Sequence, residues 1–149
     1  MRIYKFEKKI RYTAASDFDN TAIVERGNER YNCESYAIWN TKEKWEWSGH
    51  NRTLEDILKF LSLKPIRFSE VIYGDIVVFL DHCGNVAHYG LVKEKKVRVV
   101  NTIIQSKWGK SAMVKAPIGH HTVYGKKVLF ARKIRLTNFK KFGILNFET

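Results

Sequence analysis

The 149-residue chain has few of the residues that mark special classes of protein. Two cysteines are too few for a disulfide-based miniprotein. Two prolines and nine glycines exclude collagen-like and low-complexity sequences, and 44% hydrophobic residues are enough to form a buried core. The longest apolar run, Ile76–Leu80, is far shorter than the roughly 20 residues that cross a bilayer. We therefore expect a single domain over residues 1–149 with no membrane span.

Acidic residues are scarce in the second half of the chain. Residues 1–75 carry 13 basic and 12 acidic side chains, whereas residues 76–149 carry 14 and 3. Almost all of the net charge of +12 therefore lies in the C-terminal half. Lysines beside apolar strands commonly protect sheet edges, but a basic surface can also bind nucleic acid, anionic lipid or a cell-wall polymer. No motif of a nucleic-acid-binding module accompanies the charge.

The N-terminal residues do not resemble a secretory signal peptide. Met1–Glu7 alternates polar and apolar side chains as a strand does, and it lacks the apolar core of a signal sequence. We expect a cytoplasmic protein, or one delivered by a route other than Sec export. Two cysteines that need not pair suit a reducing compartment.

Two helix starts lie in the first half of the chain. Asn32 is a good N-cap and places Cys33 in the first turn of a short helix. Thr53 caps a second helix, over 53–61, whose apolar side chains repeat at helical spacing. From residue 72 onward, strand-like runs alternate with turns, at 76–80, 86–92, 97–104, 123–124 and 128–132. Helices followed by antiparallel strands predict an α+β fold.

Cys33 is a candidate nucleophile. A thiol at a helix start lies close to free backbone N–H groups and to the positive end of the helix dipole, and both favour the thiolate. The same N–H groups can hold an oxyanion during acyl transfer. A nucleophilic cysteine also needs a base.

His88 is the candidate base, because it lies inside an apolar strand. A two-residue turn at Glu94 and Lys95 would set His88 opposite Asn101, whose amide could orient the imidazole as the third member of a triad. A shifted turn would make Asn101 a diagonal neighbour. Gln105 and Ser106 are therefore alternatives for the third position.

A metal site is a rival interpretation. His82, Cys83, His120 and His121 are further possible ligands, but no CxxC or HExxH spacing is present. In a strand turn, the neighbouring His82 and Cys83 should point apart. We expect no metal and no cofactor, a solvated His82, and a loop at His120 and His121 that borders the cleft.

Four motifs in order resemble the papain-like, NlpC-type hydrolase superfamily, which includes the CHAP amidases. They are Asn-Cys-Glu-Ser-Tyr-Ala at 32–37, Gly-Asp and an apolar strand at 74–79, His-Tyr-Gly and an apolar strand at 88–92, and Asn101. Gln-Ser-Lys-Trp-Gly at 105–109 and Tyr-Gly at 124–125 resemble a poorly characterised branch of that superfamily. The resemblance covers roughly residues 30–135. Asn32 and Glu34 depart from its usual Asp before and small residue after the cysteine.

The resemblance implies a papain-like core, with N-terminal helices packed on a C-terminal antiparallel sheet. It implies a cysteine peptidase or amidase with Cys33 as nucleophile, His88 as base and Asn101 as the orienting residue, and peptidoglycan peptide is the substrate it suggests. Deamidation and acyl transfer use the same chemistry and stay open. The alternative is an inactive papain-like binding module whose basic C-terminal half binds an anionic partner.

Overall fold

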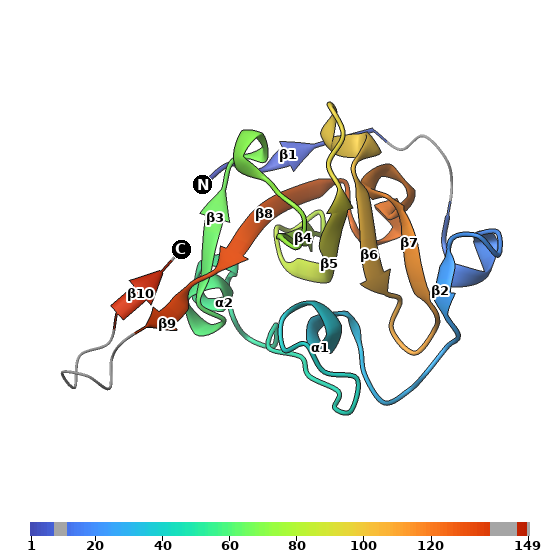
Figure 1. The fold of residues 1–149 in the computed structure, drawn as a ribbon, viewed down its shortest axis with the longest axis horizontal. Coiled ribbons are helices and arrows are strands. Elements are labelled where there is room, and N and C mark those ends of the chain that lie inside the picture. Colours follow the sequence, from blue (N-terminus) through green and yellow to red (C-terminus); the bar gives the residue numbers. More distant parts are fainter. Residues whose placement is uncertain (8–11, 138–145, 149) are drawn as a thin grey trace.

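A large antiparallel sheet forms the centre of the molecule (Figure 1). A computed structural model describes residues 1–7, 12–137 and 146–148. The eight strands follow the order β1-β8-β4-β5-β6-β7-β2, and β3 also pairs with β8. The strands are β1 Tyr4–Lys5, β2 Ile23–Glu25, β3 Leu63–Ile66, β4 Ile76–Leu80, β5 Val86–Glu94, β6 Ile103–Lys107, β7 Met113–Pro117 and β8 Lys127–Lys133.

Helices are short in the described part of the chain. The α-helices there are α1, Cys33–Ala37, and α2, Leu54–Phe60. Single 3₁₀ turns make up the other helical segments: η1 Ala15–Asp17, η2 Phe68–Glu70, η3 Val99–Asn101, η4 Ile118–His120 and η5 Thr122–Tyr124. None of the helices within the described ranges has the length and apolar character that crossing a membrane requires.

The predicted α+β fold with a papain-like core is wrong. The described residues form a β-rich fold, in which strands from the N-terminal half join the same sheet as those from the C-terminal half. The strand β3 was missed because it contains Pro65, which cannot donate a ladder hydrogen bond. It pairs with β8 on one side, and the edge of a sheet tolerates proline.

The central strand β4 is buried on both faces. Ile76, Val78 and Leu80 belong to a core that also contains Cys33 and the inner sides of α1 and α2. Val77 and Phe79 point into a second core on the other face of the sheet. The helix α1 lies beside β5 and β6 (Figure 1). Cys33 is therefore held against the first face of the sheet.

Several local predictions are confirmed. Thr53 caps α2 by accepting a hydrogen bond from the backbone N–H of Asp56 at 3.1 Å. The predicted strands at 76–80, 86–92 and 128–132 lie within β4, β5 and β8. The predicted strand at 97–104 begins only at Ile103, because 99–101 form a 3₁₀ turn. Residues 123–124 also lie in a 3₁₀ turn and not in a strand.

An ion pair between the buried Asp75 and the half-buried Arg132 joins the start of β4 to β8. The carboxylate of Asp75 accepts hydrogen bonds from Nε and a terminal nitrogen of Arg132, at 2.7 and 2.8 Å. It also accepts the backbone N–H of Ile72 at 2.8 Å. The Gly-Asp motif thus fixes the turn that leads into the central strand.

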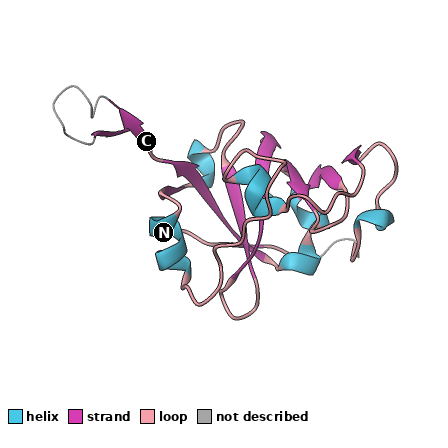
Figure 2. Cartoon of the chain, turned by 90° about the horizontal axis from the view of Figure 1, so that it is seen from below, coloured by secondary structure: helices cyan, strands magenta, loops and turns pink. Residues whose placement is uncertain are grey.

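The C-terminal strands β9, Arg135–Thr137, and β10, Asn146–Glu148, form a separate two-stranded sheet. This small sheet extends away from the eight-stranded sheet in both views (Figures 1 and 2). A single domain over residues 1–149 stays a prediction.

Candidate active site

Cys33 is the first residue of α1, as predicted. The Asn32 side chain caps the helix by accepting the backbone N–H of Ser35 at 2.9 Å, and the Ser35 hydroxyl donates to the same oxygen at 2.8 Å. The Asn32 amide also donates to the carbonyl of Glu46 at 2.6 Å. These bonds fix the backbone on both sides of the thiol, which is itself buried.

The surroundings of Cys33 favour the thiol over the thiolate. Burial raises its pKa to about 12, and the nearby Glu34 carboxylate acts in the same direction. Hydrogen bonds from the backbone N–H groups of Tyr89, Glu34 and Cys33 lower the pKa, but less than burial raises it. Backbone N–H groups at the helix start lower the pKa of the thiol, as expected, but desolvation raises it by more.

The carboxylate of Glu34 is itself fully hydrogen bonded. It accepts the backbone N–H of Ser48 at 2.7 Å, the hydroxyl of the same residue at 2.9 Å and the indole N–H of Trp39 at 2.9 Å. A buried carboxylate needs such partners. Glu34, which departs from the superfamily pattern, thus fixes the 39–48 loop to α1.

His88 lies in β5 directly opposite Phe79 of β4 and is almost fully buried. Its ring stacks on that of Tyr124, with centroids 3.8 Å apart. Its Nε2 has no hydrogen-bond partner. Burial, followed by the neighbouring His121, holds the pKa of His88 well below its ordinary value. This environment therefore favours the neutral imidazole over the imidazolium.

A cavity of about 260 Å³ brings Cys33 and His88 to one place. Trp45 and Trp47 from the 39–48 loop, together with Tyr124, also line it. His88 reaches this cavity from the Phe79 face of the sheet, whereas Cys33 packs on the other face. The pairing of β4 and β5 shifts by one residue directly beside His88, at the end of β4 and the start of β5. Such bulges redirect side chains and are frequent next to active sites.

Asn101 does not lie opposite His88, because the predicted register is wrong. Asn101 is in the 3₁₀ turn η3, and β6 pairs with β5 so that Gln105 is opposite Leu91. The sequence had predicted a two-residue turn at Glu94 and Lys95, whereas residues 95–102 connect β5 to β6. The geometric argument for Asn101 as the orienting residue therefore no longer holds.

The two alternatives for the third residue lie elsewhere as well. The side-chain amide of Gln105 donates to the hydroxyl of Tyr36 at 3.0 Å, toward α1. The hydroxyl of Ser106 is buried without a hydrogen-bond partner. Neither residue lines the cavity that contains Cys33 and His88.

The residues that do contact His88 are aromatic. The centroid of its ring lies 6.1 Å from the ring centroid of His121 and 6.3 Å from that of Trp108. The Nδ1–H of His121 donates to the carbonyl of Pro117 at 2.8 Å, which leaves Nε2 as an acceptor without a partner. Burial lowers the pKa of His121 to about 4. The sequence offered only the His-His pair after Pro-Ile-Gly as a signal for this neighbour.

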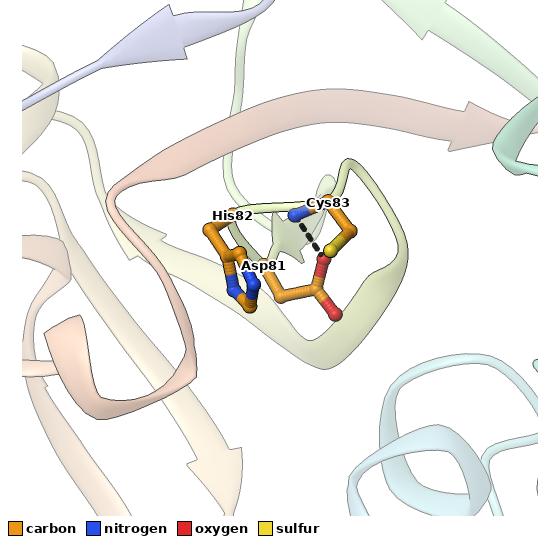
Figure 3. A group of neighbouring side chains, drawn as sticks. All are labelled: Asp81, His82 and Cys83. Carbon is orange, nitrogen blue, oxygen red and sulfur yellow. Dashed lines mark hydrogen bonds between the residues drawn. The ribbon is translucent and has the colours of Figure 1, made fainter.

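The turn after β4 brings three possible metal ligands together (Figure 3). The ligand atoms of Asp81, His82 and Cys83 all lie within 4.8 Å of one another, so the expectation that His82 and Cys83 point apart is wrong. The Asp81 carboxylate already accepts the backbone N–H groups of Cys83 and Asn85, which closes the turn. This exposed cluster is the one such group found among the described residues, and it includes neither Cys33 nor His88.

Comparison with known proteins gives no relative: no family model, curated protein or solved structure matches this chain.

Proposed function

We propose that the protein is a thiol hydrolase that cleaves an amide-type bond, with Cys33 as nucleophile and His88 as base. The observation that carries this proposal is the cavity that both residues line. One side chain is a thiol surrounded by backbone N–H groups, and the other is a neutral imidazole with an unpartnered ring nitrogen. These are the parts that nucleophilic acyl transfer needs.

The reaction begins when Cys33 Sγ attacks the carbonyl carbon and its proton passes to the His88 ring. A C–S bond forms as the carbonyl π pair moves onto oxygen. When the tetrahedral intermediate collapses, the C–N bond breaks and His88 returns the proton to the leaving amine. Water then attacks the thioester, His88 takes one of its protons, and the thiol leaves with that proton while the acid is released.

The backbone around the nucleophile is suited to the developing negative charge. The N–H groups of Cys33 and Glu34 are in the first turn of α1 and hydrogen bond to the sulfur of Cys33 in the resting protein. A helix start leaves such donors without carbonyl partners. The same donors can bind the oxyanion when the sulfur attacks.

The neutral resting pair fits a step in which base and nucleophile act together. Burial disfavours both the thiolate and the imidazolium, so a preformed ion pair is not the resting state. The proton is transferred as the C–S bond forms.

Peptidase or amidase activity is our first choice, and deamidation and acyl transfer belong to the same proposal. The order of the Cys33 and His88 motifs, which resembles that of the NlpC-type hydrolases, supports this class of chemistry. Both cysteines are free, and we propose that the protein acts in the cytoplasm, where thiols stay reduced.

The test is acylation by the activated ester p-nitrophenyl acetate in a Cys83→Ser background, which removes the exposed thiol. We expect a burst of nitrophenol and the mass of one acetyl group on Cys33. Cys33→Ala should abolish the burst, and His88→Gln should slow it by about 100-fold. A panel of peptide amides then identifies the substrate class.

Val123→Ala is the matched control, because this exposed side chain belongs to the same 3₁₀ turn, η5, as Tyr124. It should acylate at the wild-type rate. Equal rates for the His88→Gln protein and the wild type, or acetylation that persists in Cys33→Ala, would overturn the proposal.

A further inference from the structure

The turn that joins β4 to β5 carries three side chains of kinds that bind metal ions. Asp81, His82 and Cys83 follow β4 directly, and their ligand atoms all lie within 4.8 Å of one another (Figure 3). A carboxylate, an imidazole and a thiol therefore meet at one place on the surface. The cluster includes neither Cys33 nor His88, so its chemistry is separate from that of the proposed hydrolase.

The backbone of the turn holds the Asp81 carboxylate in place. Its Oδ1 accepts the N–H of Cys83 at 2.9 Å and that of Asn85 at 3.0 Å. The backbone carbonyl of Asp81 accepts the N–H of Gly84 at 3.0 Å. Hydrogen bonds of this kind orient carboxylates that bind metals. Because the side-chain bonds go to Oδ1, the second oxygen, Oδ2, is available as a ligand.

The other two side chains have room to adjust. His82 and Cys83 are exposed, whereas Asp81 is half-buried. Bonds to zinc of about 2.0–2.3 Å place neighbouring ligands of a tetrahedral site roughly 3.5 Å apart. The three ligand atoms therefore have to approach one another by about 1 Å, which rotation of exposed side chains allows.

A cavity of about 460 Å³ adjoins the cluster. Asp81 and His82 line it together with residues 122–127. Gly125 has a φ of +139°, and a Cβ at this position would collide with the carbonyl of Leu80. Only glycine therefore lets the η5 turn approach the end of β4 so closely. The fold thus places open space beside the ligands, where a water molecule or a small anion fits.

We propose that Asp81, His82 and Cys83 bind one Zn²⁺ ion. A set of thiolate, imidazole and carboxylate suits zinc, whereas Mg²⁺ and Ca²⁺ prefer oxygen ligands alone. The thiol proton passes to the solvent as the Zn–S bond forms. Three protein ligands leave the fourth tetrahedral position for a ligand from the cavity. Lys126 and Lys127 line the same cavity, and their charge favours an anion there.

Cobalt is the spectroscopic probe, because Co²⁺ occupies zinc sites and, unlike Zn²⁺, absorbs visible light. We expect one equivalent of Co²⁺ to produce a thiolate-to-metal band and the visible bands of a tetrahedral ion, and Zn²⁺ to displace it. Cys83→Ser should abolish the thiolate band. His82→Asn and Asp81→Asn should each weaken Zn²⁺ binding by at least about 10-fold. Asparagine at position 81 keeps an oxygen that can accept the two backbone N–H groups, so the turn is retained.

His50→Asn is the matched control, because it removes an exposed histidine that lies outside the cluster. Its Co²⁺ spectrum and Zn²⁺ affinity should equal those of the wild type, and Mg²⁺ should not displace the cobalt. The proposal is wrong if the thiolate band never forms or persists in Cys83→Ser. It is also wrong if His82→Asn and His50→Asn bind Zn²⁺ equally well.

Alkylation provides a second measurement that does not depend on the spectrum. Cys83 is an exposed free thiol, which iodoacetamide can reach in the metal-free protein. Excess Zn²⁺ should suppress this labelling, because the sulfur then shares its electron pair with the ion, and EDTA should restore it. Peptide mass mapping separates Cys83 from the buried Cys33. Labelling of Cys83 at the same rate with and without Zn²⁺ would show that its sulfur does not bind the ion.

Discussion

The imidazole of His88 lies flat against the phenol ring of Tyr124, with centroids 3.8 Å apart and ring planes within 3° of parallel. Tyr124 is half-buried and forms part of the cavity wall. Its ring therefore both orients the candidate base and shields it from water. The low pKa of His88 follows from this enclosure, because burial is its main cause.

Replacing Tyr124 should alter His88 directly. We expect Tyr124→Leu to raise the pKa of His88 toward its ordinary value, since water gains access to the ring. Loss of the stacked pair should also lower the free energy of unfolding by about 2 kcal/mol. An NMR titration of the imidazole and urea unfolding measure the two effects. A pKa of His88 that does not move would show that the stacking does not control its protonation.

Stability should fall in mild acid because His121 is buried in its neutral form. Its pKa is about 4 when folded and about 6.5 when unfolded. Below pH 6.5 the unfolded chain binds a proton that the folded protein does not, so stability is lost as the pH falls through this window and levels off below pH 4. Between pH 7 and pH 5 this single group should remove about 2 kcal/mol.

The comparison that isolates His121 is His121→Asn, whose amide can still donate to the Pro117 carbonyl. Its free energy of unfolding, measured in urea at both pH values, should fall less than that of the wild type. His50→Asn, at a position largely exposed to solvent, serves as the control. An equal loss of free energy of unfolding between pH 7 and pH 5 in the wild type and in His121→Asn would show that His121 does not cause the acid sensitivity.

Loss of the Asp75 carboxylate should destabilise the fold. Asp75→Ala leaves Arg132 without its partner and the turn before β4 without its acceptor, so we expect a loss of about 3 kcal/mol. Chemical denaturation measures this loss. Glu94→Ala, which breaks an exposed pair with Lys96, should give no measurable change. Equal effects at the two sites would mean that the pair of Asp75 and Arg132 does not stabilise the packing of β4 against β8.

The two cysteines should differ sharply toward alkylating reagents. Cys83 is exposed in the turn after β4, whereas Cys33 is buried with a pKa raised to about 12. Iodoacetamide at pH 7 should therefore modify Cys83 first, and Cys83→Ser should abolish rapid labelling. Peptide mass mapping gives the site. Rapid modification of Cys33 in the resting protein would show that the thiol is more accessible or more acidic than its surroundings imply.

Local signals in the sequence predicted local structure well. The caps at Asn32 and Thr53, the turn at 81–85 and the apolar run of β4 all depend on neighbouring residues, and the structure confirms them. The placement of Cys33 at a helix start follows from the same kind of signal. Its protonation could not be read from the helix start alone, because it depends on burial by residues far along the chain.

Non-local features were missed for physical reasons. The position of Asn101 depended on a register that a two-residue turn would set, but the connection from β5 to β6 covers residues 95–102 and contains the 3₁₀ turn η3. The predicted fold class was wrong because the short edge strands β2 and β3 have weak sequence patterns. They form by pairing with strands that are distant in the sequence. The neighbours of His88 come together from the ends of β6 and β7, which no sequence spacing reveals.

The hydrogen bonds of Glu34 have a consequence for how the cavity can change. They tie the loop that bears Trp45 and Trp47 to the same helix turn that presents Cys33. The wall of the cavity and Cys33 therefore share one anchor. Substitutions at the two tryptophans can reshape the wall while the anchor keeps the sulfur in place, so the shape of the cavity and the position of the thiol can change independently.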